Sequence, residues 1–406
     1  MIDDIIENRR IVITCGTGGV GKTTSAAALA LEAARRGRNV AVVTIDPAKR
    51  LAGTLGLDEL TNTPREIDRA RWDPARRGTQ QGRLSALMLD TKTTFDELVT
   101  ANAEDPEQAQ RILDNRFYRN ISGALSGTQE YMATEKLYEL HTDGGYDLVV
   151  VDTPPTRHAL DFLDAPERLM QLLDNPIFRV LMAPTRAGLR IAGFAVQAFL
   201  RTVARVVGRE VIEDVIAFLR AFEGMEEGFR SRAEGVRALL ADPATAFVLV
   251  TSPRREAVAE AVFFADELEK HDHSVDALIV NRVHPLFGEA NADGLRKRAM
   301  SIAEQATGDG SPRDSAAVRL SALYENLSDL SGLAAKERRQ VAGAAERVRS
   351  GEVAYVPLLP HDVCDFDSLH EVCRRLFDHD HGDDVAADHD DATDAGFEAG
   401  GTTGGR

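Results

Sequence analysis

The chain has 406 residues, and 43% of them are hydrophobic, so it can bury a core of enzyme size. Its formal net charge is −17. Residues 378–406 hold eight Asp and one Glu against one Arg and so contribute −8, which leaves −9 for the body. An acidic surface repels nucleic acid and anionic lipid, which argues against a role at DNA or on a membrane surface.

The N-terminus and the cysteines point to the cytoplasm. The opening residues MIDDIIENRR are acidic where a secretion signal would be basic and then apolar. No run reaches the ~18 uncharged apolar residues that a membrane helix needs. Cys15, Cys364 and Cys373 form no CxxC pair, as expected of reduced cytosolic thiols. These patterns predict a soluble, cytoplasmic protein.

Short β-branched runs recur along the chain, bounded by turn or charged residues. Continuous apolar runs of this kind are typical of strands buried on both faces of a parallel sheet. Between the first two runs, the Ala-rich segment Thr23–Arg36 predicts a helix that Gly37 ends. The pattern predicts an α/β fold with a mostly parallel twisted sheet flanked by helices. The predicted strands are Ile11–Cys15, Val40–Ile45, Leu84–Leu89, Leu148–Val151, Phe247–Val250, Ala277–Val280 and Val353–Val356.

Two connections are too long for ordinary crossovers, and we interpret them as helical insertions at about 91–145 and 156–245. Apolar residues recur at helical spacing from Val196 to Val207 and again from Val211 to Phe222. Insertions from neighbouring strand ends could pack into one helical subdomain. A further helix is predicted over about Ala322 to Val348, and the polar segment Thr61 to Arg83 as a loop. We therefore expect one domain with helical insertions over 1–377 and an acidic disordered tail over 378–406.

The loop Gly16–Thr23 reads GTGGVGKT and matches G-x-x-x-x-G-K-[ST] in full, after a strand and before a helix. Its glycines let backbone N–H groups curl around a phosphate, and the helix N-terminus adds a positive dipole end. This pattern predicts a P-loop that binds ATP, in which Lys22 reaches the β- and γ-phosphates and the Thr23 hydroxyl ligates Mg²⁺. The predicted ATP-binding residues here are Gly18, Gly19, Val20, Gly21, Lys22, Thr23 and Thr24.

Two carboxylates follow predicted strands: Asp46 after the second and Asp152 after the fourth. Ligands of open α/β sheets bind outside the carboxyl ends of the strands, so both side chains are expected at the phosphate end. One such carboxylate can hold the Mg²⁺ shell, and a second can orient the attacking water. Either residue alone could be a helix N-cap or a turn residue. The P-loop beside them favours the catalytic interpretation.

Together, GGVGKTT, Asp46-Pro47-Ala48 and DTPPT-x-H (Asp152 to His158) resemble the arsenical-pump and tail-anchored-protein-targeting ATPase family, a branch of the deviant P-loop ATPases. The resemblance runs from about residue 11 to residue 377. It implies a homodimer in which Asp46 activates water and Asp152 joins the Mg²⁺ sphere through water. It also implies that Asn281 reads adenine and that a loop containing Pro357 and Leu358 closes over the base.

The sequence departs from the family pattern at three places. Thr17 stands where the family has a Lys that reaches across the dimer to the partner's nucleotide. Lys49 and Arg50 follow the Asp-Pro-Ala motif, and Arg157 replaces a Gly in the second motif. One interpretation is that these cations are solvated or paired surface charges. The other is that Arg157 or Arg50 approaches the phosphates when the dimer closes.

Three functions fit these patterns. The leading hypothesis is an ATPase whose dimer opens and closes with nucleotide and whose helical subdomain holds a client. The second is a catalytic subunit that energises an anion-efflux membrane protein, of the arsenite type. The third is a partition-like switch or scaffold that binds a soluble partner. Co-purification of short hydrophobic segments, of a polytopic membrane protein or of a soluble protein would separate the three.

The cysteine positions generate a testable prediction about metals. No CxxC follows Asn281, where the targeting branch of the family clamps zinc between subunits, and residues 90–246 contain no Cys to bind arsenite. Trivalent arsenic and structural zinc both prefer thiolates. We expect no stoichiometric zinc by elemental analysis of the purified protein and no stimulation of ATP hydrolysis by arsenite. One zinc per dimer, or arsenite-stimulated turnover, would show that other ligands supply these sites.

Overall fold

The computed structural model describes residues 2–46, 50–75, 82–122, 128–175, 208–286, 291–307, 315–349 and 352–377. Its centre is an eight-stranded sheet in the order β3-β4-β2-β5-β1-β6-β7-β8. Neighbouring strands run parallel except β3 and β4, which pair antiparallel. The strands are β1 Ile11–Cys15, β2 Asn39–Thr44, β3 Arg65–Glu66, β4 Arg83–Met88, β5 Leu148–Asp152, β6 Thr245–Thr251, β7 Val275–Val283 and β8 Val353–Pro357.

Helices cover both faces of this sheet, which explains why the strands read as continuous apolar runs. Helices α1 (Ile2–Asn8), α2 (Lys22–Arg35) and α18 (Phe366–Phe377) pack on one face, in a core with Val12, Val150 and Val248. Helices α8 (Thr128–Thr142), α14 (Glu226–Ala241) and α15 (Arg255–Lys270) pack on the other, against Ile13 and Val151. Successive residues of one strand therefore enter different cores. The predicted α/β fold with a mostly parallel sheet is confirmed.

The predicted loop from Thr61 to Arg83 is wrong in part. It holds the two-residue strand β3 and the short helix α4 (Arg69–Trp72). Trp72 is 1% exposed, and its indole Nε1 donates to the carbonyl of Ile67 at 3.1 Å. The buried Trp72 side chain anchors this segment. Because β3 and α4 are too short to show hydrophobic periodicity, the polar composition of the segment predicts a loop instead.

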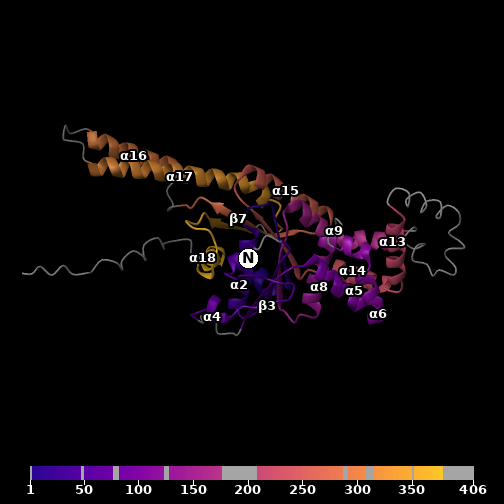
Figure 1. Ribbon diagram of the computed structural model, residues 1–406. Helices are drawn as coiled ribbons and strands as arrows, with labels where there is room; N and C mark the ends of the chain where they lie inside the picture. The colour runs from indigo at the N-terminus through magenta and orange to yellow at the C-terminus, as the bar shows by residue number, and fades with distance from the viewer. Residues whose placement is uncertain are drawn as a thin grey trace, which may run out of the picture.

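The two long connections form one helical layer beside the sheet (Figure 1). The first supplies α5 (Thr91–Asn102), α6 (Pro106–Leu113), α7 (Arg116–Ile121) and α8; the second supplies α9 (Thr156–Asp174), α13 (Arg209–Ala221) and α14. Tyr118 stacks on Phe218 with ring centroids 6.2 Å apart, and Phe222 lies 4.8 Å from Phe229. These contacts belong to a third apolar cluster, to which both insertions contribute residues. The predicted helix over Val196–Val207 and the acidic tail fall outside the described residues.

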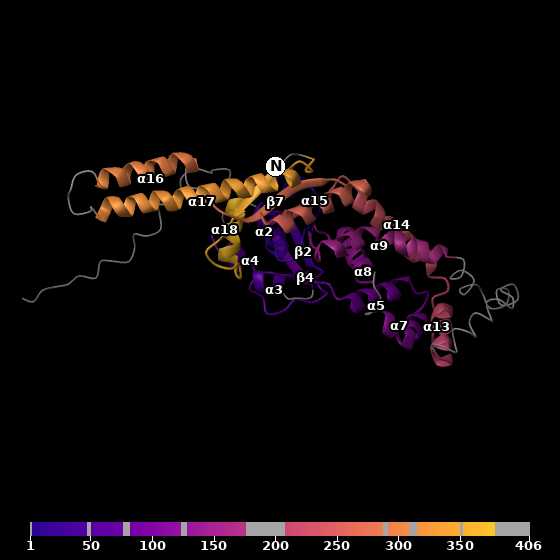
Figure 2. The ribbon, with the colours of Figure 1, turned by 90° about the horizontal axis from the view of Figure 1, so that it is seen from above.

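A helical hairpin of α16 (Ala292–Thr307) and α17 (Ser315–Ala345) projects from the body on the side away from the helical layer (Figures 1 and 2). The sequence predicted α17 only from Ala322 and did not predict α16. The hydroxyl of Ser321 donates to the Ala299 carbonyl at 2.9 Å, and that of Ser328 to the Ala292 carbonyl at 2.7 Å. The outward face carries exposed apolar side chains, among them Leu320, Leu323, Leu330 and Leu333.

The base of the hairpin is fastened to the end of β7. Glu337 on α17 is 8% exposed. One oxygen of its carboxylate accepts the backbone N–H of His284 at 2.7 Å, and the other oxygen lies 2.7 Å from the imidazole Nδ1 of the same residue.

Among the described residues, no helix is long and apolar enough to span a bilayer.

Candidate nucleotide site

The P-loop lies between β1 and α2, at the carboxyl edge of the sheet, and two of its glycines leave no room for a side chain. Gly21 has φ +99°, and a Cβ built there would lie 2.1 Å from the Asn281 side-chain nitrogen. Gly16 has φ +151°, and its Cβ would lie 2.1 Å from the Val250 carbonyl oxygen. Both residues need a backbone conformation that other residues rarely adopt. The glycine spacing is thus dictated by close packing against β6 and β7 as well as by the loop's own curvature.

Asp152 ends β5 and is 1% exposed. Its Oδ2 accepts hydrogen bonds from the Thr23 hydroxyl at 2.8 Å and the Thr44 hydroxyl at 2.9 Å. Its Oδ1 is buried with no hydrogen-bond partner among the described residues. Burial raises the pKa of this carboxyl to about 6. Mg²⁺ prefers oxygen ligands. The Asp152 carboxylate and the Thr23 hydroxyl fit this preference, and Oδ1 is a buried acceptor that such an ion would satisfy.

Lys22 and Asp46 flank this carboxylate. The Lys22 ammonium donates to the Thr17 carbonyl at 3.0 Å, and the residue is 8% exposed. Burial lowers the pKa of Lys22, and the charge of Asp152 acts against that shift. Asp46 follows β2, its backbone N–H donates to Thr44 Oγ1 at 3.2 Å, and its carboxylate lies 3.5 Å from the Arg50 guanidinium. The Thr44 hydroxyl therefore contacts both acidic positions, a link that no motif in the sequence indicates.

On the opposite side of the loop, Asn281 lies where β7 meets the P-loop. Its Nδ2 donates to the Val20 carbonyl at 2.8 Å, and its Oδ1 accepts the backbone N–H of Arg282 at 2.9 Å. After β8, the backbone N–H of Leu358 donates to the Val283 carbonyl at 2.8 Å. The structure thus brings the residue expected to read adenine and the loop expected to cover it to the same rim.

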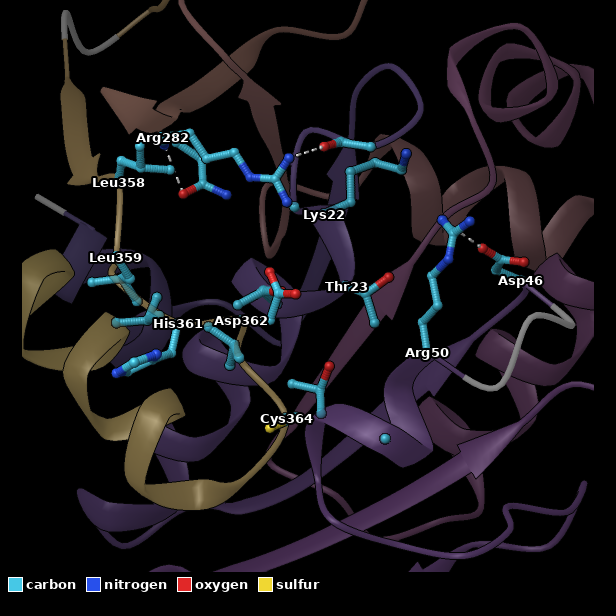
Figure 3. A pocket seen from close by; sticks show the side chains of 18 of the residues that line it. Lys22, Thr23, Asp46, Arg50, Arg282, Leu358, Leu359, His361, Asp362 and Cys364 are labelled. Atoms are coloured by element: carbon cyan, nitrogen blue, oxygen red, sulfur yellow. Dashed lines mark hydrogen bonds and ion pairs between the residues drawn. The ribbon is translucent and has the colours of Figure 1, made fainter. Parts of the chain in front are cut away.

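A cavity of about 580 Å³ joins these parts (Figure 3). That volume is in the usual range of a small-molecule site. Of the predicted residues, its walls include Gly19, Gly21, Lys22, Thr23, Thr24, Asp46, Asn281, Pro357 and Leu358. Gly18, Val20 and Asp152 do not line it; Asp152 is bonded directly to the lining residue Thr23. Arg50, a predicted candidate for phosphate contact, and Leu359, which follows Leu358 in the predicted loop over the base, line it as well. Residues that sequence reasoning did not assign to nucleotide binding also contribute: Gly53, Thr54, Thr153, Pro155, Arg282, His361, Asp362, Val363, Cys364 and Val372.

The cations that depart from the family pattern can be placed only in part. Arg50 lines the cavity and pairs with Asp46, although it is largely exposed to solvent. Lys49 and the side chains of Arg157 and His158 lie outside the described residues. The hypothesis that a switch-segment arginine replaces the missing Lys therefore remains a prediction.

Comparison with known proteins locates the chain among nucleotide-dependent enzymes. A family described as anion-transporting ATPase matches residues 9–305. "ATPase GET3" of Phaeosphaeria nodorum is 22% identical over 276 residues, covering 68% of this chain and 76% of the relative. "ATPase GET3" of Kluyveromyces lactis is 26% identical over 305 residues, 72% of this chain and 76% of the relative. "ATPase ASNA1 homolog" of Dictyostelium discoideum is 24% identical over 286 residues, 70% and 75% respectively.

The buried state of Asp152 generates a prediction about pH. Its pKa is raised from 3.8 to about 6, so the folded nucleotide-free chain holds a proton that the unfolded chain releases between those values. The free energy of unfolding should therefore fall as pH rises from about 4 to about 6, by on the order of 3 kcal/mol. In Asp152→Asn this fall should disappear. The measurement is urea unfolding across that pH range without Mg²⁺ or nucleotide, with the surface change Asp293→Asn as the control. Equal pH dependence in Asp152→Asn and the parent would show that this carboxyl does not titrate as a buried group.

Proposed function

We propose that this chain, which belongs to the family of anion-transporting ATPases and hydrolyses ATP, uses Mg²⁺-dependent hydrolysis to open and close a homodimer that holds a client on its helical layer. The observation that carries the proposal is the single cavity that joins Lys22 and Thr23 of the P-loop, Asp46 and Asn281. It would provide a phosphate cradle, a carboxylate for water and a rim for the base within one cavity.

In the proposed reaction, the P-loop amides and Lys22 hold the phosphate chain while Asp46 orients a water molecule and accepts its proton. The water oxygen bonds to the γ-phosphorus, and the bond between that phosphorus and the bridging oxygen breaks, leaving ADP and phosphate. Mg²⁺ bound with ATP would neutralise charge on the phosphate oxygens. Thr23 and, through water, Asp152 would hold that ion, because Asp152 Oδ1 is the buried acceptor without a partner among the described residues.

In the proposed resting state of the enzyme, Arg50 forms an ion pair with Asp46. Asp46 Oδ2 lies 3.5 Å from the Arg50 guanidinium, and the nearby positive charge makes this carboxylate a weaker acceptor for a proton from water. Arg50 is largely exposed, so its side chain can change partner at little cost in packing. We propose that closure of the dimer moves Arg50 onto a phosphate and frees Asp46 for catalysis. Arg157 is the other candidate for this role.

The helical layer is the proposed client surface, since Leu172 is 52% exposed on α9 and Val211 is 40% exposed on α13. The family's description favours a second candidate, a subunit that drives anion efflux through a membrane partner. Thiols offer that function little support: Cys15 and Cys373 are buried, burial raises the pKa of Cys15 to about 12, and Cys364 lines the nucleotide cavity. A scaffold for a soluble partner is the third candidate.

Two substitutions test the assignment of binding and catalysis. Lys22→Ala removes the cation from the phosphates and should weaken Mg²⁺-ATP binding at least ~10-fold. Asp46→Asn leaves the cradle intact, so it should bind ATP with the parent's affinity and lose turnover by about 10²–10⁴-fold. Calorimetry and phosphate release measure the two effects, with the hairpin change Lys297→Ala as the control. Parent-like ATP affinity in Lys22→Ala would refute the P-loop assignment, and parent-like turnover in Asp46→Asn would make Asp46 a structural residue.

The hydrolysis-deficient Asp46→Asn protein also tests the coupling. With Mg²⁺-ATP it should sediment as a closed dimer, and with ADP or no nucleotide the dimer should open or dissociate. Pull-downs with the trapped protein should enrich short hydrophobic segments if the leading proposal is right. Enrichment of one polytopic membrane protein would favour anion efflux, and a soluble partner would favour the scaffold. Sedimentation that does not respond to nucleotide would contradict the proposed gating.

A further inference from the structure

Arg282 occupies an unusual place in the sheet. The register between β7 and β8 shifts there, because Asn281 pairs with Val356 and Val283 with Pro357, which leaves Arg282 as the extra residue of a bulge. Its φ is +62°, a left-handed conformation that residues other than glycine seldom adopt. Bulges beside binding sites re-aim one side chain. Here the bulge turns the Arg282 side chain toward the P-loop.

The guanidinium reaches a backbone atom of that loop. Arg282 NH1 donates to the Gly19 carbonyl oxygen at 3.2 Å, and Figure 3 shows the side chain extending along the cavity toward Lys22. This bond engages one of the five N–H donors that a guanidinium carries. Arg282 also lines the cavity, so the cation borders the space that the nucleotide would fill.

The backbone on both sides of Arg282 is held in place. Before it, the Asn281 side chain caps the Arg282 N–H at 2.9 Å; after it, the Val283 carbonyl accepts from Leu358 and the His284 N–H binds Glu337. The left-handed conformation is therefore imposed by several independent contacts, as is typical of strain at functional sites. A neutral carbonyl is a weaker partner for a guanidinium than a phosphate oxygen, which accepts charge-assisted and bidentate bonds.

We propose that Arg282 is a phosphate-binding residue, whose guanidinium leaves the Gly19 carbonyl for oxygens of the nucleotide's phosphate chain in the same subunit. The inference rests on the proposed ATP site and adds a ligand contact to it. The Arg282 side chain runs from the residue beside Asn281 to the P-loop. A nucleotide with its base near Asn281 and its phosphates on the P-loop would therefore lie along this side chain. Thr17 provides no cation at the loop, and Arg282 supplies one without a partner subunit.

The decisive variant is Arg282→Gly, because glycine keeps the left-handed backbone and the bulge while removing the guanidinium. Calorimetry with Mg²⁺-ATP, Mg²⁺-ADP and adenosine should show losses of about 10–100-fold for ATP and ADP and little change for adenosine. Arg282→Lys keeps the charge and loses the fork, so it should recover part of the affinity. Arg296→Ala, which removes an exposed cation of the hairpin, is the matched control for net charge.

Each outcome decides one question. Parent-like affinity of Arg282→Gly for ATP and ADP would overturn the proposal and leave Arg282 as a brace for the loop. An equal loss for adenosine would also overturn it, because the variant would then have disturbed the Asn281 rim. Lys22→Ala in the same series separates the two levels of inference. If Lys22→Ala loses ATP and Arg282→Gly does not, the ATP site stands and only the new contact fails; if Lys22→Ala keeps its affinity, the site itself is misassigned.

Discussion

The carboxylate of Asp152 is the interaction on which the rest of the site depends. It ends β5 in the middle of the sheet, and one of its oxygens binds hydroxyls from α2 and β2, the elements that carry Lys22 and precede Asp46. Its other oxygen is buried without a partner among the described residues, which is a costly state for an acceptor. A single buried carboxylate thereby links the P-loop helix to the adjacent strand and marks the place where a cation is most favourable.

Much of this arrangement could be predicted because the relevant signals are local. Strands buried on both faces must be continuously apolar, and the P-loop glycines are required by turns that no Cβ fits. Asp46 and Asp152 follow strands in the sequence, and parallel strands end at a common edge. Arg282 could not be found in this way. Its role in the cavity depends on a bulge between β7 and β8, and pairing register is a long-range property that one residue's neighbours do not encode.

Helix α16 and the start of α17 escaped prediction for a different reason. Helix α17 packs on α16 through small and polar residues such as Ser321 and Ser328, whereas Leu320, Leu323 and Leu330 face outward. A prediction that takes the apolar face of a helix as its buried face would therefore orient α17 incorrectly. Polar hydroxyls can line a tight helix interface when they bond to the neighbouring backbone, as both serines do. These two hydrogen bonds therefore add to the burial of Leu295 and Ala299 of α16.

The contact between Glu337 and His284 gives the hairpin a mechanical relation to the cavity rim. About 33 Å of α17 lies between its first residue, Ser315, and Glu337, whose carboxylate binds His284, two residues beyond Arg282. A displacement of the far end of the hairpin would rotate it about this contact. If a ligand of the hairpin shifts Glu337, thermodynamic reciprocity requires nucleotide and that ligand to alter one another's affinity by the same factor. Binding at the hairpin would then be coupled to the P-loop through the contact between Glu337 and His284.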